Sequence, residues 1–541
     1  MSEPQLQSQR ERSPLAEMLT VALPTIVTMS SFTVMQFVDS LMVSRIGPES
    51  HYVAAQGNGG MANWVALSLF FGATSVINTF VSQNLGAGRP ERGAGYGWTG
   101  VWLAVGYWPF MLLAAAAMPF VFGLLDHEGE LLKNEIAYAQ ILLVGSLFKL
   151  ISKGTGEFFF GIHKPIVVTV SVIAGNLVNV VANYVLIFGR VSVPQLEGVI
   201  PGMAALNDAL APVDESLPAL GVLGAAYGTV IGYVVEMVIQ LGVFVGPSFN
   251  RQFKTRSAWR FSGGKAKDVV RLGWPAGGQF VNETACWWIL TAFLLGAGGA
   301  AKAVHSGSTD PALSDQAREV NNAAGWIGLR YMHAAFMPTV GLSIAVTAIV
   351  GRCMGSGRPD LAAARTWLGL KLAIGYMGLC AIAFIVLKEP MIGLFIDDAA
   401  SPEQRAMLLE VGAGVMIAAA AFQLGDALGI MLIGALRGAG DTTWPSLVNI
   451  ALSWIFIVGA GWLAVEFLPQ LGSIGPWIAA AMFITALGIA MLVRFLGGKW
   501  KTIQLVESGP EGSRDPHLTQ TLPGEELTVP PEPLAGAKPG N

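Results

Sequence analysis

The sequence predicts an all-α integral membrane protein with twelve transmembrane helices in two related six-helix halves. Only 13% of its 541 residues are charged and its mean hydropathy is +0.55, whereas about 25% of the residues of a soluble domain are charged. The apolar residues form long blocks rather than one face of a helix, which is typical of membrane spans. A long internal repeat divides the chain into the two halves.

The repeat is clearest in two short segments that follow apolar blocks. Residues 81–95 read VSQNLGAGRPERGAG and residues 350–364 read VGRCMGSGRPDLAAA, at an offset of 269. Each copy carries glycines that break a helix and an Arg-Pro pair that does not belong in lipid. Upstream the offset falls to 251, which aligns Pro24 with Pro275. The chain therefore contains two related halves.

The apolar blocks predict the helices in order, each long enough to cross about 30 Å of hydrocarbon. The first half contains 15–44, 53–80, 97–125, 135–160, 165–189 and 219–246, and the second contains 272–299, 320–350, 366–387, 408–436, 444–466 and 474–497. The predicted organisation is a tail at 1–14, an N-lobe at 15–250, a basic linker at 251–271, a C-lobe at 272–500 and a disordered tail at 501–541.

The loop charges predict the orientation. Because each half has an even number of spans, both enter the membrane from the same side, as parallel repeats about an axis along the membrane normal. Basic residues collect on one side: Arg10, Arg12, Arg89, Arg92, Lys164, the linker, Arg352, Arg358, Arg365, Arg437, Lys499 and Lys501. Acidic residues collect on the other: Asp126, Glu128, Glu130, Glu197, Asp208, Asp214, Glu215, Asp310, Asp315, Asp397 and Asp398. The positive-inside rule predicts that both termini are cytoplasmic.

Two long outer loops, 190–218 and 300–319, contain Pro, Gly, Asp and Ser. They are either lids or solvated insertions, and we favour the insertions. The linker is rich in Lys and Arg, which suits it to bind anionic lipid headgroups. Control of the membrane topology explains these basic residues equally well.

Polar residues inside the predicted spans are the candidate functional residues, because such residues are costly in lipid. In the N-lobe they are Asp39 with Gln36 one turn before it, and Asn179 with Asn183 one turn after it. In the C-lobe they are Glu283 with Asn282 and Gln279, and Asp426 with Gln423.

Helix geometry places these candidates at two depths. At about 1.5 Å per residue, Glu283 and Asp426 lie roughly 17 Å from the cytoplasmic ends of their helices, whereas Asp39 and Asn183 lie in the outer half. A buried carboxylate can take up a proton or, with neutral oxygen ligands, Na⁺. The alternative is a structural carboxylate that hydrogen-bonds between helices, and we favour the functional interpretation.

Two weaker groups remain open. Lys149, Lys153 and Glu157 recur every four residues in the fourth span and predict an internal ion pair rather than a substrate contact. Arg330 and His333 in the eighth span either line a cavity or anchor the helix near the outer surface.

Other classes of protein fit poorly. The three cysteines, Cys286, Cys353 and Cys380, have no paired spacing for a disulfide framework or a metal knuckle. The polar start of the chain predicts no cleaved signal peptide. Gly296-Ala-Gly298 ends a helix instead of opening one after a strand, and is therefore not a dinucleotide site. We expect no enzyme activity, no cofactor and no nucleic-acid partner.

Several motifs, in this order, resemble the multidrug and toxic compound extrusion (MATE) family, over about residues 15–500. They are Pro24 with Gln36 and Asp39, VSQNLGAGRPERG, FFFGIHKP, NVVANYVLIFG, Pro275 before Glu283, and GALRGAGDTTWP after Asp426. The resemblance implies twelve helices in two six-helix lobes around a central cleft. It also implies a cation-coupled antiporter that expels organic, often cationic, compounds.

The resemblance also suggests roles for residues. Glu283 and Asp426 match carboxylates implicated in cation coupling in the NorM-like branch, and are candidate ligands of Na⁺. Asp39, Asn179 and Asn183 match the N-lobe polar cluster, with Asp39 as a third cation-coupling candidate. The DinF-like branch has a second aspartate where this chain has Asn183, which favours coupling through the C-lobe. Gln279, Asn282, Gln423 and Arg330 are candidates for lining the cavity.

The expected mechanism is exchange by a monomer in the bacterial inner membrane. Na⁺ or H⁺ enters from outside, neutralises Glu283 and Asp426, and releases an organic cation outward before the lobes rock back. Alternatives are a flippase or exporter of a lipid-linked precursor or other metabolite from the same superfamily, or a major-facilitator transporter. The acidic interior disfavours the flippase, whose cleft is strongly cationic, and GAGRPERG lacks the Asp-Arg pair of the major facilitators. Nothing in the sequence resembles the filter of a channel.

Overall fold

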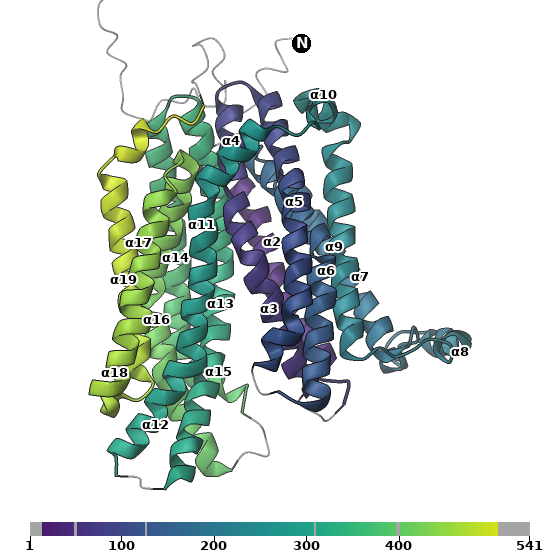
Figure 1. Ribbon diagram of the computed structural model, residues 1–541, viewed down its shortest axis with the longest axis vertical. Helices are drawn as coiled ribbons and strands as arrows, with labels where there is room; N and C mark the ends of the chain where they lie inside the picture. The colour runs from purple at the N-terminus through teal and green to yellow at the C-terminus, as the bar shows by residue number, and fades with distance from the viewer. Residues whose placement is uncertain (1–12, 48–50, 125–126, 308–309, 397–400, 507–541) are drawn as a thin grey trace, which may run out of the picture.

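The computed structural model describes residues 13–47, 51–124, 127–307, 310–396 and 401–506. Within them are twelve helical spans that are long and apolar enough to cross a membrane. The helices run roughly along the long axis of the molecule in two adjacent groups (Figure 1). These groups are the N-lobe and the C-lobe, and the twelve-helix prediction is confirmed.

The N-lobe contains the first six spans. Its helices are α2 (Pro14–Val43), α3 (His51–Thr74) with α4 (Val76–Gly86), α5 (Pro90–Gly123), α6 (Gly129–Gly161), α7 (Ile166–Phe188) and α9 (Val222–Phe244). Proline stands in the first turn of α2 and of α5, where its missing N–H costs no hydrogen bond. The third span therefore begins at Pro90, earlier than the predicted residue 97, because the turn residues Arg89 and Pro90 start the helix directly.

The C-lobe contains the other six spans, two of which are interrupted by π-helix. Its seventh span is α11 (Gly263–Ile289), the π-helix η3 (Leu290–Leu294) and α12 (Leu295–His305), followed by α13 (Pro311–Gly355), α14 (Pro359–Val386), the short α15 (Lys388–Gly393) and α16 (Pro402–Ala439). The eleventh span is α17 (Thr443–Ser453), the π-helix η4 (Trp454–Ala460) and α18 (Gly461–Phe467), and the twelfth is α19 (Ile474–Leu496). The 3₁₀ turns η5 (Pro469–Leu471) and η6 (Lys499–Thr502) flank α19.

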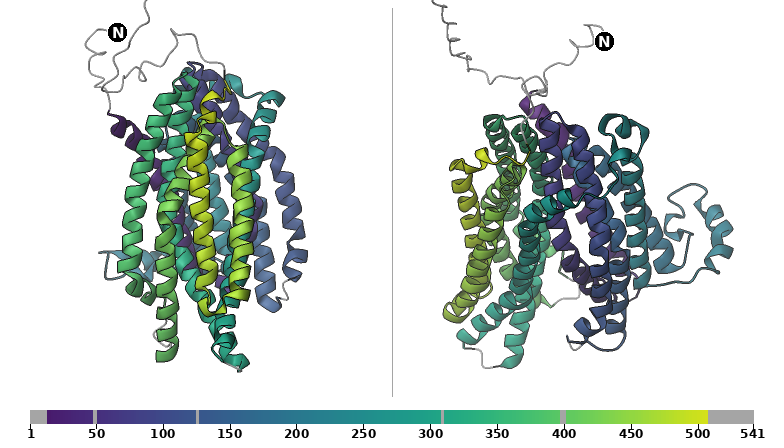
Figure 2. Two further views of the ribbon diagram at one scale, coloured as in Figure 1. Left: turned by 90° about the vertical axis from the view of Figure 1, so that its left-hand side faces the viewer. Right: turned by 45° about the horizontal axis from the view of Figure 1, so that its top comes forward.

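Three predicted loops contain helix. The predicted outer loop 300–319 is mostly helical, since α12 continues to His305 and α13 begins at Pro311 with Asp310 as its N-cap. The outer loop 190–218 contains η1 (Pro194–Leu196) and α8 (Met203–Asp214), which stand to the side of the N-lobe (Figure 2). The linker contains α10 (Pro247–Phe253) and η2 (Thr255–Ala258), and α11 begins inside it. Polar segments can form short helices once a neighbouring surface is available, and composition does not reveal that surface.

We call the end of the bundle that carries Arg89, Lys164, Arg358 and α10 the basic end. At this end the repeat makes reciprocal contacts. A Cβ built on Gly86 would lie 1.9 Å from the Arg352 carbonyl oxygen, and one on Gly355 would lie 1.9 Å from the Gln83 carbonyl oxygen. The offset of 269 that aligns Gly86 with Gly355 also aligns Gln83 with Arg352, so the two contacts are equivalent under the repeat. The glycines are therefore where the backbones of the two lobes meet.

Side-chain hydrogen bonds between the lobes, among the described residues, cluster at the basic end. Thr79 Oγ1 donates to the Arg437 carbonyl oxygen at 2.9 Å, and Gln83 Nε2 donates to the Gly438 carbonyl oxygen at 3.0 Å. Arg365 forms an ion pair with Glu17 at 2.9 Å. The others join Asn78 to Ile344 and Tyr96 to Asp268. The lobes are thus closed against each other at the basic end.

Candidate functional site

The C-lobe candidates converge on Glu283 of α11. Its Oε1 accepts hydrogen bonds from Gln279 Nε2 at 3.2 Å and from Asn449 Nδ2 of α17 at 2.7 Å. Ser446 Oγ in turn donates to Gln279 Oε1 at 3.0 Å. The side chains that hydrogen-bond to the carboxylate are therefore neutral amides, which orient it. The Arg437 guanidinium is close enough for its charge to act on Glu283. The sequence analysis did not identify Asn449. It lies one helical turn after Ser446 on α17, the fifth span of the C-lobe, and both side chains belong to this site.

Asn282 belongs to a neighbouring network on the same two helices. Its Nδ2 donates to Ser453 Oγ at 2.7 Å, and its Oδ1 accepts from Trp454 Nε1 at 2.7 Å. Both helices pass into π-helix near this network, α17 at Trp454 itself and α11 at Leu290, eight residues after Asn282. Single π turns occur frequently at functional sites, because they rotate the side chains that follow. Asn282 therefore ties the two interrupted helices together.

Asp426 and Gln423 of α16 complete the C-lobe group. The Asp426 carboxylate is close enough to Glu283 for their charges to interact, and it makes no side-chain hydrogen bond to another described residue. Gln423 is buried; its Nε2 donates to the Ala419 carbonyl oxygen at 3.2 Å, and its Oε1 has no partner. Asn449 Oδ1 is likewise buried without a partner. Two orphaned amide oxygens thus accompany two carboxylates.

This donor set suits a cation that prefers oxygen ligands. Carboxylate and amide oxygens bind hard cations, and a buried acceptor without a partner is costly unless a ligand or water satisfies it. No group of three or more His, Cys, Asp or Glu side chains that could hold a metal ion occurs in the described part of the chain. The residues therefore fit a monovalent cation or a proton better than a multivalent metal.

The N-lobe candidates form a second group near the opposite end of the bundle. Asp39 Oδ1 accepts a hydrogen bond from Asn183 Nδ2 at 2.6 Å, and Asn183 Nδ2 also donates to Asn179 Oδ1 at 3.3 Å. Asn179 Nδ2 donates to Thr229 Oγ1 of α9 at 3.3 Å. Gln36 is exposed on α2 and shares no hydrogen bond with this group. The structure thus brings three of the four N-lobe candidates together.

Arg330 lies apart from both groups. It is exposed on α13, and its guanidinium carbon lies 5.8 Å from the centroid of the Phe395 ring. A cation over an aromatic face gains a modest electrostatic attraction. His333, one turn along α13, is partly buried beside Phe336. Of the two predicted roles for Arg330, this position agrees better with anchoring the helix than with contact to the carboxylates.

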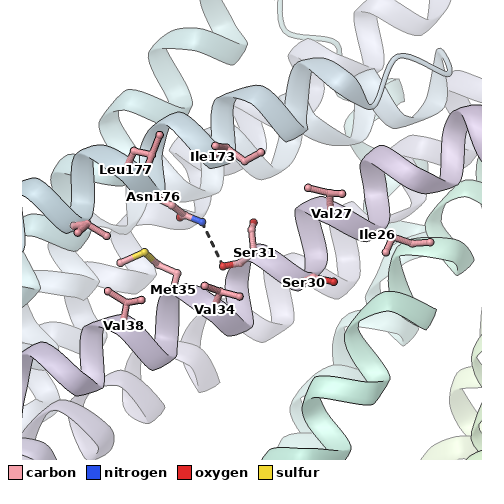
Figure 3. Close-up of a pocket in the computed structure, with 11 residues that line it drawn as sticks. Ile26, Val27, Ser30, Ser31, Val34, Met35, Val38, Ile173, Asn176 and Leu177 are labelled. Atoms are coloured by element: carbon pink, nitrogen blue, oxygen red, sulfur yellow. Dashed lines mark hydrogen bonds between the residues drawn. The ribbon is translucent and has the colours of Figure 1, made fainter. Parts of the chain in front are cut away.

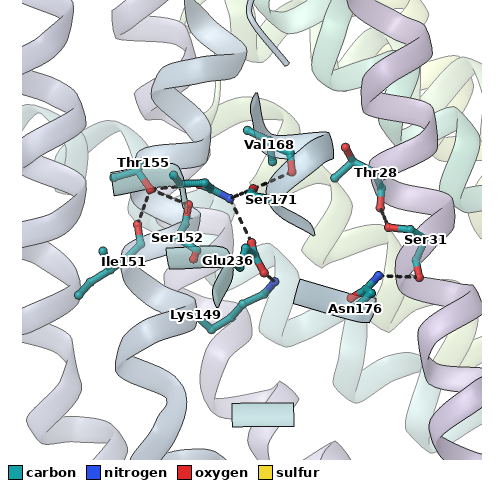
Figure 4. Close-up of polar contacts among 11 residues, drawn as sticks. Thr28, Ser31, Lys149, Ile151, Ser152, Thr155, Val168, Ser171, Asn176 and Glu236 are labelled. Carbon is teal, nitrogen blue, oxygen red and sulfur yellow. Dashed lines mark hydrogen bonds and ion pairs between the residues drawn. The ribbon is translucent and has the colours of Figure 1, made fainter. Parts of the chain in front are cut away.

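The structure confirms one predicted ion pair in α6 and adds another. Lys153 pairs with Glu157 one turn away, as predicted. Lys149, however, pairs with Glu236 of α9 at 2.6 Å, and both side chains are only 9% exposed (Figure 4). The sequence reading missed Glu236, although an acid with Gln240 one turn after it in a predicted span is the same signal that identified Glu283.

A groove of about 440 Å³ lies between α2 and α7 (Figure 3). Its walls are largely apolar, with Val34, Met35 and Leu177 on opposite sides. Asn176 Nδ2 donates to the Ser31 carbonyl oxygen at 3.4 Å across the groove. None of the residues predicted from the sequence lines it. The volume is within the range of small-molecule sites.

Comparisons with known proteins agree with this architecture. The chain is 28% identical to the "Probable multidrug resistance protein NorM" of Pseudomonas syringae pv. tomato over 92% of this chain and 97% of that protein. It is 26% identical to the "Multidrug resistance protein PmpM" of Pseudomonas aeruginosa over 90% of this chain and 92% of that protein.

Solved structures show the same fold. An outward-facing multidrug resistance MATE family transporter superposes with a TM-score of 0.72 at 17% identity, over 91% of this chain and 98% of that one. The eukaryotic MATE transporter AtDTX14 superposes with a TM-score of 0.71 at 15% identity, over 90% and 96% of the two chains. The family model described as MatE matches residues 24–185 and 319–462, more than half of the chain. This multi-pass membrane protein therefore belongs to the MatE family of multidrug and toxic compound extrusion transporters.

Proposed function

We propose that this protein is a secondary antiporter that exports organic, chiefly cationic, compounds in exchange for Na⁺ or H⁺. The observation that carries the proposal is Glu283, a carboxylate in a span whose side-chain hydrogen bonds come from the neutral amides of Gln279 and Asn449. A carboxylate inside the membrane is costly, and binding a cation or a proton lowers that cost. The relatives named as multidrug resistance proteins support the substrate class.

The coupling ion binds at Glu283 and Asp426, with Asp39 as a separate N-lobe carboxylate. Na⁺ would use carboxylate oxygens together with the orphaned oxygens of Asn449 and Gln423, whereas H⁺ would need only the carboxylates. Either ion removes negative charge from the interior and so weakens the attraction for an organic cation, whether or not the two share a ligand. Binding of one cation then opposes binding of the other, and this opposition couples their opposite movements.

Alternating access follows from the way the lobes meet. We place the basic end in the cytoplasm, according to the positive-inside rule, and the protein as a monomer in the bacterial inner membrane. The contacts at Gly86 and Gly355 then close the cytoplasmic side, so that the cation enters from outside. A rocking of the lobes that separates this contact would open the cytoplasmic side for the next organic cation.

The test is transport of ethidium in proteoliposomes under an imposed Na⁺ gradient and, separately, an imposed pH gradient. Movement against the ethidium concentration under one gradient supports antiport and identifies the coupling ion. Glu283→Gln, reconstituted at the same density and orientation, should abolish that movement.

Failure of both gradients with folded, oriented protein would contradict transport of a generic organic cation. The same vesicles loaded with a fluorescent lipid-linked precursor would then test the flippase alternative.

A further inference from the structure

The ion pair between Lys149 and Glu236 has surroundings that resemble a binding site for an ammonium group. Lys149 Nζ lies 2.6 Å from Glu236 Oε2, 4.6 Å from the centroid of Phe32 and 5.2 Å from the centroid of Tyr233. A carboxylate together with two aromatic faces is the environment that organic ammonium ions prefer. The four residues come from three helices, α2, α6 and α9, so that tertiary packing assembles the site.

The carboxylate is held in place independently of the lysine. Gln240 Nε2 donates to Glu236 Oε1 at 3.3 Å and to Ser171 Oγ at 2.9 Å, and Thr155 Oγ1 donates to Gln240 Oε1 at 3.1 Å (Figure 4). One carboxylate oxygen is thus fixed by neutral groups from α6, α7 and α9, while the other faces Lys149. A cation other than Lys149 would find this second oxygen already oriented.

The site lies deep in the membrane and next to the groove. Lys149 is twelve residues from the end of α6 at Gly161, which is about 18 Å along the helix. A Cβ built on Gly175 of α7 would lie 3.5 Å from Glu236 Cβ, and the next residue, Asn176, lines the groove between α2 and α7. Helix α7 therefore stands between Glu236 and the groove, with a glycine on the side that faces Glu236, and the groove is large enough for the body of an organic cation.

Stability alone does not explain such a pair. Replacing a buried ion pair by apolar residues is often neutral or stabilising, because desolvation opposes the attraction between the charges. Ionisable groups inside a membrane therefore indicate function. The pair in α6 between Lys153 and Glu157 differs, since it forms within one helical turn and Lys153 faces one ring, Phe71, at 5.2 Å.

We propose that Glu236, Phe32 and Tyr233 bind the ammonium group of the transported organic cation, and that Lys149 occupies this site when the cation is absent. The proposal rests on the organic-cation function above. Lys149 is an internal competitor: its flexible stem withdraws when the organic cation arrives, and its return assists release. Glu236 is paired in both states, with Lys149 when the organic cation is absent and with the ammonium group when it is bound, so that this carboxylate is never left unpaired.

The test measures binding without any ion gradient, on the purified full-length protein in detergent. In Lys149→Ala, n-butylammonium chloride should raise the midpoint of thermal unfolding by about 2 °C or more, whereas 1-butanol should not. Ethidium should bind Lys149→Ala about tenfold or more tightly than wild type, since the internal competitor is gone. The double variant Lys149→Ala/Glu236→Gln should show neither effect.

Lys153→Ala is the matched control, one turn along the same helix and with its own carboxylate. Equal stabilisation of Lys153→Ala by n-butylammonium would show that any buried carboxylate that has lost its lysine takes the amine, and would overturn the proposal. Unchanged ethidium affinity in Lys149→Ala would also overturn it.

If Lys149→Ala cannot be purified, the double variant decides, because it carries no buried charge here. It must bind ethidium about tenfold more weakly than wild type, and wild-type affinity would refute the site. Because these measurements use no gradient, they are independent of whether gradient-driven transport succeeds.

Discussion

Each lobe pairs a carboxylate with an asparagine, and the two pairs lie at different depths in the membrane. In the N-lobe, Asp39 of the first helix accepts a hydrogen bond from Asn183 of the fifth, and in the C-lobe, Glu283 of the seventh helix accepts one from Asn449 of the eleventh. Asp39 lies four residues before the end of α2 at Val43, whereas Glu283 lies twenty residues into a span that continues to His305. The repeat decides which helices meet, and single residues decide where the charge lies.

The surroundings of the two pairs differ as well. The N-lobe adds two lysines, Lys149 and Lys153, each paired with a glutamate. The C-lobe site adds Asp426 and two interrupted helices, and π-helix occurs only in this lobe among the described residues. We therefore expect the C-lobe to bind the inorganic cation and the N-lobe to bind the organic one. Of the four experiments below, the first two test this division and the other two test the lobe contact and the connections between helices.

The largest effect should come from the carboxylates themselves. Glu283→Gln keeps the shape of the side chain but removes its charge, and should lower gradient-driven ethidium transport by about 100-fold or more, whereas Asp39→Asn should lower it by about tenfold or less. The measurement is initial transport rate in proteoliposomes at equal protein density. Equal losses in the two variants would break the comparison, since both lobes would then contribute equally to coupling.

The asparagines that hydrogen-bond to these carboxylates test the same difference between the lobes. Asn449→Ala removes the amide that orients Glu283, and should weaken the apparent affinity for the coupling cation by about 10-fold to 100-fold, as losses of outer ligand-orienting groups do. Asn183→Ala should change it by less than about threefold. The readout is the concentration of the coupling cation that gives half-maximal transport. A larger effect in Asn183→Ala would assign coupling to the N-lobe.

The contact between the lobes at the basic end should depend on glycine. Gly86→Ala places a methyl group against the Arg352 carbonyl, and should lower the midpoint of thermal unfolding by several degrees. Gly106→Ala in α5 has no atom within 4 Å of the added group and should stabilise the helix by about 0.5–1 kcal/mol. Thermal unfolding of the two purified variants checks this. Wild-type stability of Gly86→Ala would mean that the lobes do not close at Gly86.

The smallest effect concerns the connection after α7, which is long in the N-lobe and short between α18 and α19 in the C-lobe. The Ser192 hydroxyl and the Val191 N–H donate to Asp214, and these bonds hold the pKa of that carboxyl below its usual 3.8. Because the pKa of Asp214 is lower in the folded segment, these bonds stabilise the segment at any pH above the usual pKa of 3.8. This contribution is lost as the pH falls through the lowered pKa. Asp214→Asn should therefore raise proteolytic cleavage within 190–218 at neutral pH by roughly threefold. Unchanged cleavage would show that other contacts order the segment.

Much of the candidate site could be predicted because lipid makes polar residues conspicuous. Glu283, Asp426 and Asp39 stand out in apolar runs, and a spacing of four residues correctly associates Gln279 with Glu283 and Lys153 with Glu157. The same rule applied to the sixth span would have found Glu236. Partners within one helix follow from local spacing, since residues four apart lie on one face.

The sequence by itself determined the twelve spans and the duplication, because hydrocarbon requires long apolar helices whose backbone groups bond internally. The glycines of the repeat were predicted to break helices, and only the tertiary structure showed that Gly86 and Gly355 let the backbones of the two lobes approach closely. Only the tertiary structure decided that Lys149 pairs with Glu236 and that Glu283 meets Asn449, 166 residues away. Pairing between helices depends on how each helix is rotated and how deeply it packs, and many distant contacts set these together. Local pattern carries little information about that rotation, so the polar residues were visible in the sequence while their partners were not.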